Sequence, residues 1–285
     1  RSYFRKIVKP RFSGVCSTDI AVIRAKENND QNFLFYFIAN PYFVNFASLP
    51  GEGTKMPRAK WSYLSETEWF IPKIEEQRRI SSILSSFDDK IELNNKIAKI
   101  LEEMANIIFK EWFSSTEKNG NIRDIAFVKT GNRPGKLTEK KENNFTIPVY
   151  GAKEIMGYTN KSLYNQQIII TGRVGTIGEV TIINEPSWPS DNALILIPKD
   201  YNYFYFIYFI AKRINYLSLN RGSSQPLIAQ SDIENYFINF PDKNLIIKFN
   251  LIVSKLFLLK VNKENENQKL AMMRNLLLPK LMKGE

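Results

Sequence analysis

The chain has 285 residues, of which 44% are hydrophobic and 13% aromatic, so it is long enough for more than one domain and too apolar for a disordered protein. It contains one cysteine and no histidine, which excludes disulfide frameworks, zinc fingers and histidine-based catalysis. The formal net charge of +11 favours a polyanionic partner, although excess Lys also serves simply to keep a protein in solution.

The N-terminal residues show no targeting segment. Residues 1–6 lack both a starting Met and the apolar stretch of a signal peptide, so we expect the chain to begin inside a longer protein. The longest apolar run, Tyr203 to Ala211, is far shorter than the ~18–20 residues that cross a bilayer. These features predict a cytoplasmic protein without a membrane span.

Residues 75–113 contain no Pro or Gly, and their apolar residues recur at steps of three and four. This spacing predicts one long helix, about 58 Å at ~1.5 Å per residue, with a heptad seam on one side. Glu75 and Glu76, shortly after Pro72, suit a helix start. Asn94 falls on the seam, where a lone polar residue can fix the register of the partner helix.

Residues 121–240 resemble a mixed module built on short strands. Runs rich in β-formers and bounded by Gly, Pro, Asn or Asp predict strands at 147–150, 167–171, 178–183 and 193–197. A helix is expected at 202–217. Residues 1–72 match only the last part of such a module, so the first module is predicted to be truncated.

A second long helix is predicted from Lys243 to Met282, with Pro241 and Asp242 at its start. Its middle, residues 263–268, is strongly polar. This stretch is expected either to lie uncovered by the partner helix or to interrupt the helix.

A shift of 169 residues places these segments on one another, which indicates an internal duplication. The aromatic run 35–38 falls on 204–207, and Pro72 falls on Pro241. Further matched pairs are Gly53 with Gly222, Pro57 with Pro226, Ile83 with Ile252, Ser85 with Ser254, Leu101 with Leu270, Met104 with Met273 and Asn106 with Asn275.

The chain resembles the specificity subunits of type I restriction–modification systems. The resemblance spans nearly all of the sequence and rests on blocks at 71–80, 131–134, 147–152, 157–159, 172–178, 188–191 and 222–228, all in order. It implies target recognition domains, each followed by a long helix. Two departures are the missing first part of the first recognition domain and a second helix start without the Glu-Glu-Gln of residues 75–77.

DNA recognition needs side chains for base edges and for phosphates, which Arg, Lys, Asn, Gln, Ser and Tyr on loops supply. The predicted DNA-binding residues are Lys129, Thr130, Asn132, Arg133, Lys136, Lys153, Tyr158, Arg173, Arg221, Ser223, Ser224 and Gln225. For each loop the simpler interpretation is a solvated surface turn. The glycines near Arg173 are better explained by turn geometry.

The helix seams have a similar pair of interpretations. The residues expected to pair helices or bind a partner are Ile80, Leu84, Phe87, Ile91, Asn94, Leu101, Ile108, Trp112, Leu256, Leu270 and Leu277. Periodicity favours a plain intramolecular coiled coil. The resemblance implies that the remaining helix faces bind methyltransferase subunits.

Two catalytic interpretations fit poorly. Residues 40–43 resemble the Asn/Asp-Pro-Pro-aromatic loop of amino-methylating enzymes but lack the second proline, and no Gly-x-Gly cofactor loop follows a strand. A nuclease would need clustered carboxylates for a metal, and Asp242 has no Glu-x-Lys after it. We therefore expect no catalytic residues, cofactor or metal.

The sequence thus predicts an α+β protein with mixed α/β target recognition domains separated by two long antiparallel coiled-coil helices. The expected segments are the C-terminal part of a first recognition domain (1–72), a first spacer helix (73–113), a second recognition domain (114–240) and a second spacer helix (241–285). We expect a non-catalytic subunit that recognises a bipartite target in double-stranded DNA and directs methyltransferase and restriction subunits to it. A second copy of the truncated chain is a further candidate partner. The alternative is a coiled-coil interaction scaffold without sequence-specific DNA binding.

Overall fold

The computed structural model describes residues 6–48, 61–114, 117 and 119–284. The chain forms two compact units, residues 1–99 with 260–285 and residues 100–259. Both long helices pass from one unit into the other. No helix within the described ranges is long and apolar enough to cross a membrane.

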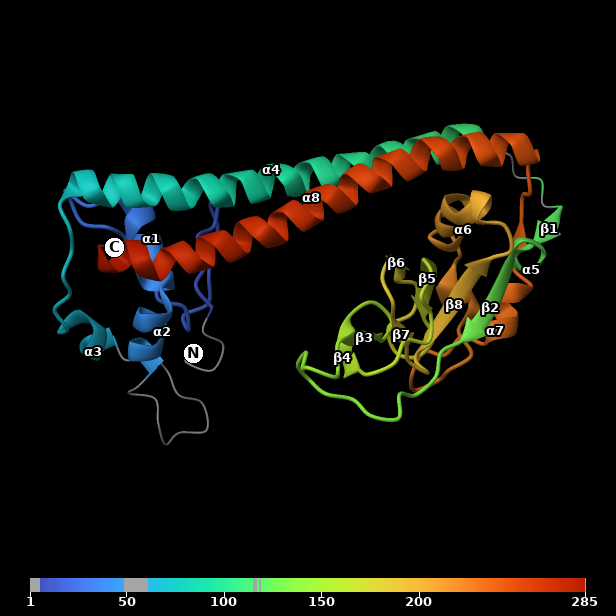
Figure 1. The fold of residues 1–285 in the computed structure, drawn as a ribbon, viewed down its shortest axis with the longest axis horizontal. Helices are drawn as coiled ribbons and strands as arrows, with labels where there is room; N and C mark the ends of the chain where they lie inside the picture. The colour runs from blue at the N-terminus through green and yellow to red at the C-terminus, as the bar shows by residue number, and fades with distance from the viewer. Residues whose placement is uncertain (1–5, 49–60, 115–116, 118, 285) are drawn as a thin grey trace. The chain divides into compact units, whose positions relative to one another are not determined.

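The first unit is helical (Figure 1). It contains α1 (Gln31–Ala39), α2 (Pro41–Ser48), α3 (Trp61–Ser65), the first part of α4 (Ile74–Trp112) and the last part of α8 (Lys243–Lys283). Asp30 caps α1 by accepting a hydrogen bond from the N–H of Phe33 at 2.7 Å. Glu75 and Glu76 lie in the first turn of α4, where the helix dipole favours negative charge.

The core of the first unit joins three helices. Its buried residues come from α1, α4 and α8 and are Phe33, Tyr36, Ile80, Leu84 and Leu278. Beside this core the hydroxyl of Tyr36 donates to Asp88 at 2.6 Å, and Arg274 of α8 pairs with the same carboxylate. Residues early in α4 therefore meet residues late in α8, so the two helices run antiparallel in this unit.

A polar layer crosses the helix pair within the first unit. Asn94 is fully buried, and its Nδ2 donates to Oδ1 of Asn267 at 3.0 Å. Asn267 in turn donates to Asn95 at 2.8 Å, and Lys90 of α4 pairs with Glu266 at 3.7 Å. Both expectations for the polar stretch of α8 were wrong: the helix is continuous, and α4 covers the stretch with polar groups of its own.

The second unit contains two sheets and a helical layer (Figure 1). Besides the remaining parts of α4 and α8, its elements are β1 (Gly120–Asn121), α5 (Ile122–Ile125), β2 (Ala126–Thr130), β3 (Ile147–Tyr150), β4 (Ile155–Thr159), β5 (Ile168–Gly172), β6 (Val180–Ile183), β7 (Trp188–Pro189), β8 (Ala193–Pro198), η2 (Tyr201–Tyr203), α6 (Phe204–Ala211), η3 (Tyr216–Leu219), α7 (Gln230–Glu234) and β9 (Phe237–Ile238). The larger sheet is antiparallel in the order β2-β8-β5-β6, and the smaller has the order β4-β3-β7 with β3 and β7 parallel. A short antiparallel pair joins β1 to β9.

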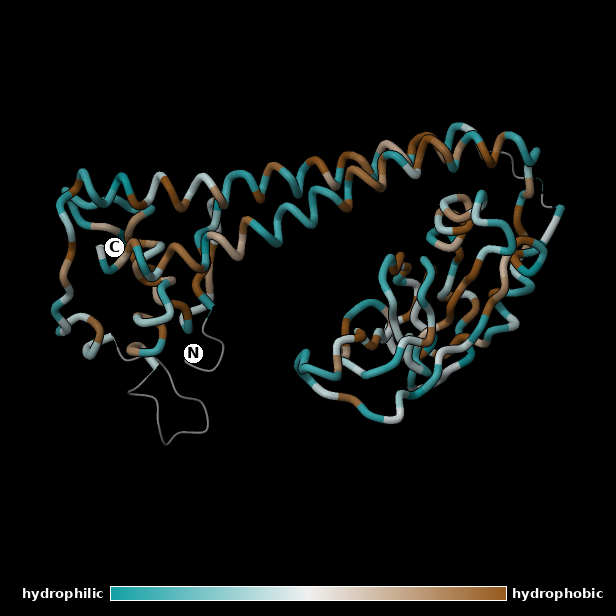
Figure 2. Tube along the Cα trace, viewed as in Figure 1, coloured by the Kyte–Doolittle hydropathy of each residue, from teal (hydrophilic) through white to brown (hydrophobic). Residues whose placement is uncertain are grey.

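Strands β5 and β8 are buried on both faces. On one face Ile169 and Leu194 belong to the main core with α6, and on the other Ile168 and Ile195 pack in a cluster with Tyr150. This explains why both strands are continuous apolar runs and do not alternate with polar residues. Figure 2 shows these runs, and it shows apolar residues recurring along both long helices.

Helix α6 is apolar on all sides because it is covered on all sides. The ring of Phe209 stacks on Phe109 of α4 with centroids 5.5 Å apart, and Phe206 meets Phe113 edge-on at 5.0 Å. Phe249 of α8 packs edge-on against Phe209 of α6 at 6.0 Å. These aromatic contacts fix α6 to both long helices within the second unit.

The helices and strands compare closely with the sequence-based expectations. The first long helix is confirmed at Ile74–Trp112, the second at Lys243–Lys283, and each of the four predicted strands is present. The helix expected at 202–217 was wrong in length, because α6 ends at Ala211 and a separate 3-10 turn begins after Asn215, whose side chain accepts from the N–H of Ser218. Strands β2 and β4 and the two-residue strands β1, β7 and β9 were not predicted.

The segments matched by the 169-residue shift occupy similar positions. The aromatic runs 35–38 and 204–207 lie in α1 and α6, and each helix packs on the long helix that follows it in the chain. Asp30 caps α1, and Asp200 caps the 3-10 turn that leads into α6. The pairs that include Gly53 and Pro57 lie outside the described residues. The proposed segment boundaries at 72, 113 and 240 stay a prediction.

Candidate nucleic-acid interface

Several loops of the second unit meet at one end of the larger sheet. Strand β2 ends at Thr130 opposite Leu194, and β5 ends at Gly172 opposite Ala193, the first residue of β8. Because the strands are antiparallel, the loops that follow β2 and β5 and the loop that precedes β8 share this end. We call the loops at 130–135, 172–179, 188–193 and 220–228 the loop end of the sheet.

The first loop carries Arg133 and is held by backbone contacts. The N–H of Gly131 donates to the carbonyl of Ala193 at 3.0 Å, and the indole N–H of Trp188 donates to the carbonyl of Asn132 at 2.7 Å. A side chain at Gly131 would lie 2.1 Å from the carbonyl oxygen of Ser190, so only glycine fits. Arg133 projects from this fixed turn with 84% of its side chain exposed.

The second loop carries Arg173 and joins two others. The N–H of Arg173 donates to Asn192 at 2.8 Å, and its carbonyl accepts from Ile228 at 3.0 Å. Gly175, with a φ of +73°, donates its N–H to Pro226 at 3.0 Å. The side chain of Arg173 is half-buried, and its Nε has no hydrogen-bond acceptor among the described residues. The glycines here set turn geometry, as expected.

The third loop, residues 220–228, presents small polar groups. Asn220 organises it by accepting hydrogen bonds from the N–H groups of Gly222 and Leu227, each at 2.9 Å. Arg221 forms an ion pair with Asp232 of α7. Three further predicted DNA-binding residues follow in this loop, and all three are exposed: Ser223, Ser224 and Gln225.

Most of the predicted DNA-binding residues therefore come together at the loop end. Lys153 joins them through an ion pair of 3.2 Å with Glu179, which directly precedes β6 at the same end. Lys129 is exposed on β2, and the hydroxyl of Thr130 donates to Gln230 at 3.4 Å.

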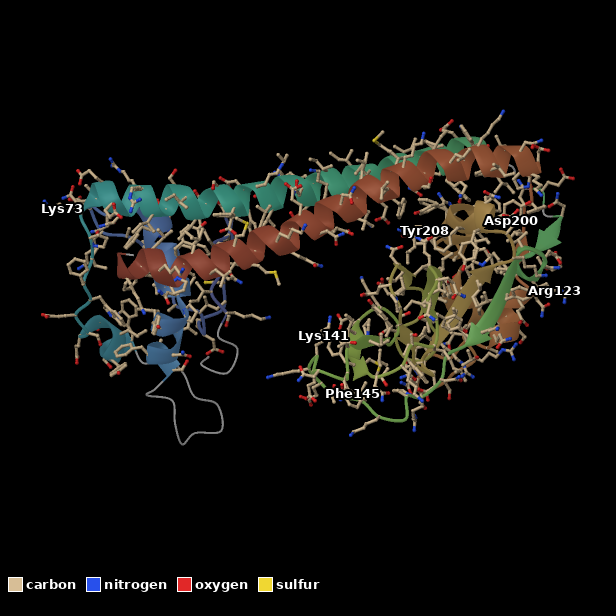
Figure 3. The ribbon with its side chains drawn as sticks, in the orientation of Figure 1. Lys73, Arg123, Lys141, Phe145, Asp200 and Tyr208 are labelled. Carbon is tan, nitrogen blue, oxygen red and sulfur yellow. The ribbon has the colours of Figure 1, made fainter. Side chains whose placement is uncertain are left out.

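Two predicted residues lie outside these loops, Tyr158 on β4 and Lys136 in the segment that follows the first loop. Tyr158 of β4 exchanges backbone hydrogen bonds with Thr138 at 2.8 and 2.9 Å, and the ammonium of Lys136 lies 5.3 Å from the ring centre of Phe145. Figure 3 shows Phe145 beside Lys141 near β4.

A family model for the type I restriction modification DNA specificity domain matches residues 6–103 and 115–270. The chain belongs to this family. Both matched ranges end inside a long helix, the first in α4 and the second in α8. The matches thus repeat the order of module and helix that the duplication predicted.

Individual relatives agree with the family. The MjaIX specificity subunit of Methanocaldococcus jannaschii is 29% identical over 306 residues, covering 91% of this chain and 70% of that protein. The HindI specificity subunit of Haemophilus influenzae is 32% identical over 102 residues, covering 35% of this chain and 22% of that protein. The crystal structure of a type I restriction–modification system S subunit from M. genitalium has a TM-score of 0.61 at 20% identity, covering 89% of this chain and 73% of that one. The predicted fold class is confirmed.

Sequence reasoning missed the carboxylates of this specificity domain. Three predicted cations each have an acidic partner, and the pairs are Arg133 with Asp191, Lys153 with Glu179 and Arg221 with Asp232. Most partners lie tens of residues apart in the chain, so no local spacing connects them. Asp191 does fall in one of the blocks that carried the family resemblance, and this was the available signal.

The predicted helix residues divide by burial. Ile80, Leu84 and Asn94 are buried, while the others are half-buried and are Phe87, Ile91, Leu101, Ile108, Trp112, Leu256, Leu270 and Leu277. Ile108, Trp112 and Leu256 pack against the main core of the second unit. Packing within the chain thus covers part of this set, and the roles of these residues in helix pairing or partner binding stay a prediction. Large apolar side chains on other faces of α4 remain exposed, namely Leu93, Ile100, Met104 and Ile107.

Proposed function

We propose that the chain is a non-catalytic DNA-binding subunit that recognises a bipartite duplex target and brings methyltransferase and restriction subunits to it. The observation that carries this proposal is the meeting of Arg133, Arg173 and Arg221 with small polar side chains at the loop end of a chain from the DNA specificity family. Arginine forks suit guanine edges and phosphates, and Ser and Gln supply further donors and acceptors.

Selection from a random duplex library tests this proposal. The full chain, assembled with its methyltransferase partner, should enrich two short half-sites separated by a fixed number of unread base pairs. Its affinity should also fall steeply with salt concentration, because phosphate contacts release counterions. No enrichment and a flat salt dependence would favour the scaffold interpretation.

Two arginine variants separate base contacts from phosphate contacts. If Arg173 contacts a base, Arg173→Ala should relax the preference at one position of the target. If Arg133 contacts a phosphate, Arg133→Ala should weaken all sequences alike and reduce the salt slope by about one. Equal loss on every sequence for both variants would remove the base-reading role from Arg173.

The long helices are proposed to set the spacing between the two half-sites. Inserting seven residues into α4 after Asn95 and seven into α8 at the facing Asn267 lengthens each helix by about 10 Å at ~1.5 Å per residue and preserves the seam. The preferred spacer should then grow by about three base pairs at ~3.4 Å per step. An unchanged spacer would contradict this role.

The exposed apolar face of α4 supports a protein partner. Ile100, Met104 and Ile107 are spaced by four and three residues and are 53%, 46% and 57% exposed, so they share one face of the helix. We assign this face to the methyltransferase subunit. Ile107→Asp should prevent co-elution with that subunit on gel filtration, whereas Lys248→Asp, at an exposed lysine of α8, should not.

A further inference from the structure

Two of the cations at the loop end each form an ion pair with an exposed carboxylate. Arg133 lies 3.3 Å from Asp191, and the two side chains are 84% and 38% exposed. Lys153 lies 3.2 Å from Glu179, with 60% and 48% exposed. Both pairs stand where the proposed function places DNA, and both carboxylates would lie close to its phosphates.

The backbone holds these carboxylates in place. Asp191 belongs to a tight turn in which Ala193 donates its N–H to the carbonyl of Ser190 at 3.0 Å and Asn192 donates to its hydroxyl at 3.3 Å. Glu179 stands between Gly178 and the first residue of β6. Glu179 thus shares its loop with Arg173, and Asp191 lies in the loop 188–193 at the same end of the sheet.

Folding does not explain these two pairs. Exposed ion pairs contribute little to stability, because water screens them and ordering two side chains costs entropy. Their electrostatic effect on DNA is larger, since a carboxylate beside a cation cancels the potential that attracts a phosphate. Sequence-independent affinity comes almost wholly from such cation–phosphate contacts. Discrimination often depends on a repulsive element of this kind as well as on attractive contacts.

We propose that Asp191 and Glu179 are specificity-determining residues that keep the affinity of the loop end for arbitrary DNA low. A duplex without the target offers only phosphates, which must compete with the two carboxylates for Arg133 and Lys153. In the target complex the base contacts hold Arg133 and Lys153 away from the two carboxylates, so the competition acts mainly on other duplexes. An equal gain of affinity for both duplexes would overturn the proposal. This inference rests on the proposed function.

The test uses the full chain and the neutral variants Asp191→Asn and Glu179→Gln. Fluorescence anisotropy would measure binding of the selected target duplex and of a scrambled duplex of equal length and composition, at 50 to 300 mM KCl. Each variant should bind the scrambled duplex about two- to fivefold more tightly and with a salt slope steeper by about one. Affinity for the target should change less than twofold, so the ratio of the two affinities falls.

Matched variants separate this effect from a general change in charge. Glu111→Gln changes the net charge equally on an exposed site of α4 and should leave the scrambled duplex unaffected. The gain from Asp191→Asn should vanish in an Arg133→Ala background, because the cation that it releases is then absent. Far-UV circular dichroism melts would show that the variants are folded.

Two other results would also overturn the inference. One is an unchanged affinity for the scrambled duplex in both variants. The other is a loss of target affinity of more than tenfold, which would mean that a carboxylate accepts a hydrogen bond from a cytosine amino group and reads a base directly. If the unaltered chain prefers no DNA sequence, the proposed function itself fails. This result differs from the two above, so failure of the inference can be told apart from failure of the proposed function.

Discussion

Asp232 holds Arg221 with one carboxylate oxygen and accepts the N–H of Ala229 with the other at 3.0 Å. The carboxylate is only 12% exposed, unlike the carboxylates beside Arg133 and Lys153. It caps α7 and fixes the guanidinium end of the Arg221 side chain at the same time. Asp232 is thus a positioning residue for Arg221, whereas the side chains of Asp191 and Glu179 are exposed to solvent.

A double-mutant cycle tests this positioning role. Arg221→Ala and Asp232→Ala should each weaken target binding, and the double variant should be little worse than either, because both remove one oriented guanidinium. Asp232→Ala should also lower the free energy of unfolding by about 1 kcal/mol through the lost cap. Additive losses in DNA affinity, measured by anisotropy, would show that the two residues act separately.

Phe206→Ala tests how much the packing of α6 contributes to the stability of the second unit. Phe206 is fully buried between the sheet and the long helices, so its truncation should lower the free energy of unfolding by about 3–5 kcal/mol. Urea denaturation would measure the loss. Phe237→Ala, at a ring that is 61% exposed, serves as the control and should change stability by less than 1 kcal/mol.

The helices were predictable and the loop end was only partly so. An uninterrupted spacing of three and four over residues 75–113 leaves helix as the only structure that buries the apolar face, and the structure has it at Ile74–Trp112. Strand β4 was missed because it contains Gly157, and β2 because it ends in the polar residues Lys129 and Thr130, so neither has a strong local pattern. Their positions depend on pairing with distant strands.

The partners of the charged residues could not be predicted for the same physical reason. Arg133 and Asp191 meet because β2 and β8 pair antiparallel in one register, which brings together loops from distant parts of the sequence. Similarly, the polar stretch of α8 was expected to break or stand uncovered because its partner residues on α4, Asn94 and Asn95, lie far away in the chain. Local spacing carries no information on such pairs.

Tyr216 makes the stability of the second unit depend on pH in the alkaline range. Burial disfavours the phenolate and raises the pKa of this tyrosine to about 12, above the ordinary value of ~10. The folded state therefore holds the proton more tightly than the unfolded chain. Its contribution is complete below pH ~10 and is lost as the pH rises toward 12, by at most about 1.4 kcal/mol per unit.

Tyr216→Phe should remove this part of the alkaline destabilisation. Urea midpoints at pH 9, 10 and 11 would fall less steeply in the variant than in the unaltered chain. Tyr42→Phe is the matched control, because Tyr42 is 58% exposed and lies in the other unit. Parallel curves for the unaltered chain and the Tyr216 variant would refute the assignment.

For the buried pair of Asn94 and Asn267, the sign of the predicted effect on stability depends on whether one or both residues are replaced. Asn94 is fully buried, donates to Asn267 and leaves its own Oδ1 without a partner among the described residues. Asn267→Leu should therefore destabilise the helix pair by about 1–3 kcal/mol, because it removes the amide oxygen that accepts a hydrogen bond from the buried Asn94 side chain. Replacing both by Leu should be neutral or stabilising, since no polar group on the seam is then left unsatisfied.

The double variant should gain stability at the expense of a unique register, because a buried Asn pair disfavours slipped pairings that an all-Leu seam tolerates. Urea denaturation gives the stabilities, and Asn265→Leu at an exposed position of α8 controls for the added side chain. Disulfide formation between cysteines placed at Leu84 and Leu278, in a Cys16→Ser background, reports the native register. Cysteines at Leu84 and Ala271 report a slip of one heptad. This second disulfide should form only when both asparagines are replaced. If it does not form in that variant, the packing around Leu84 sets the register without the asparagine pair.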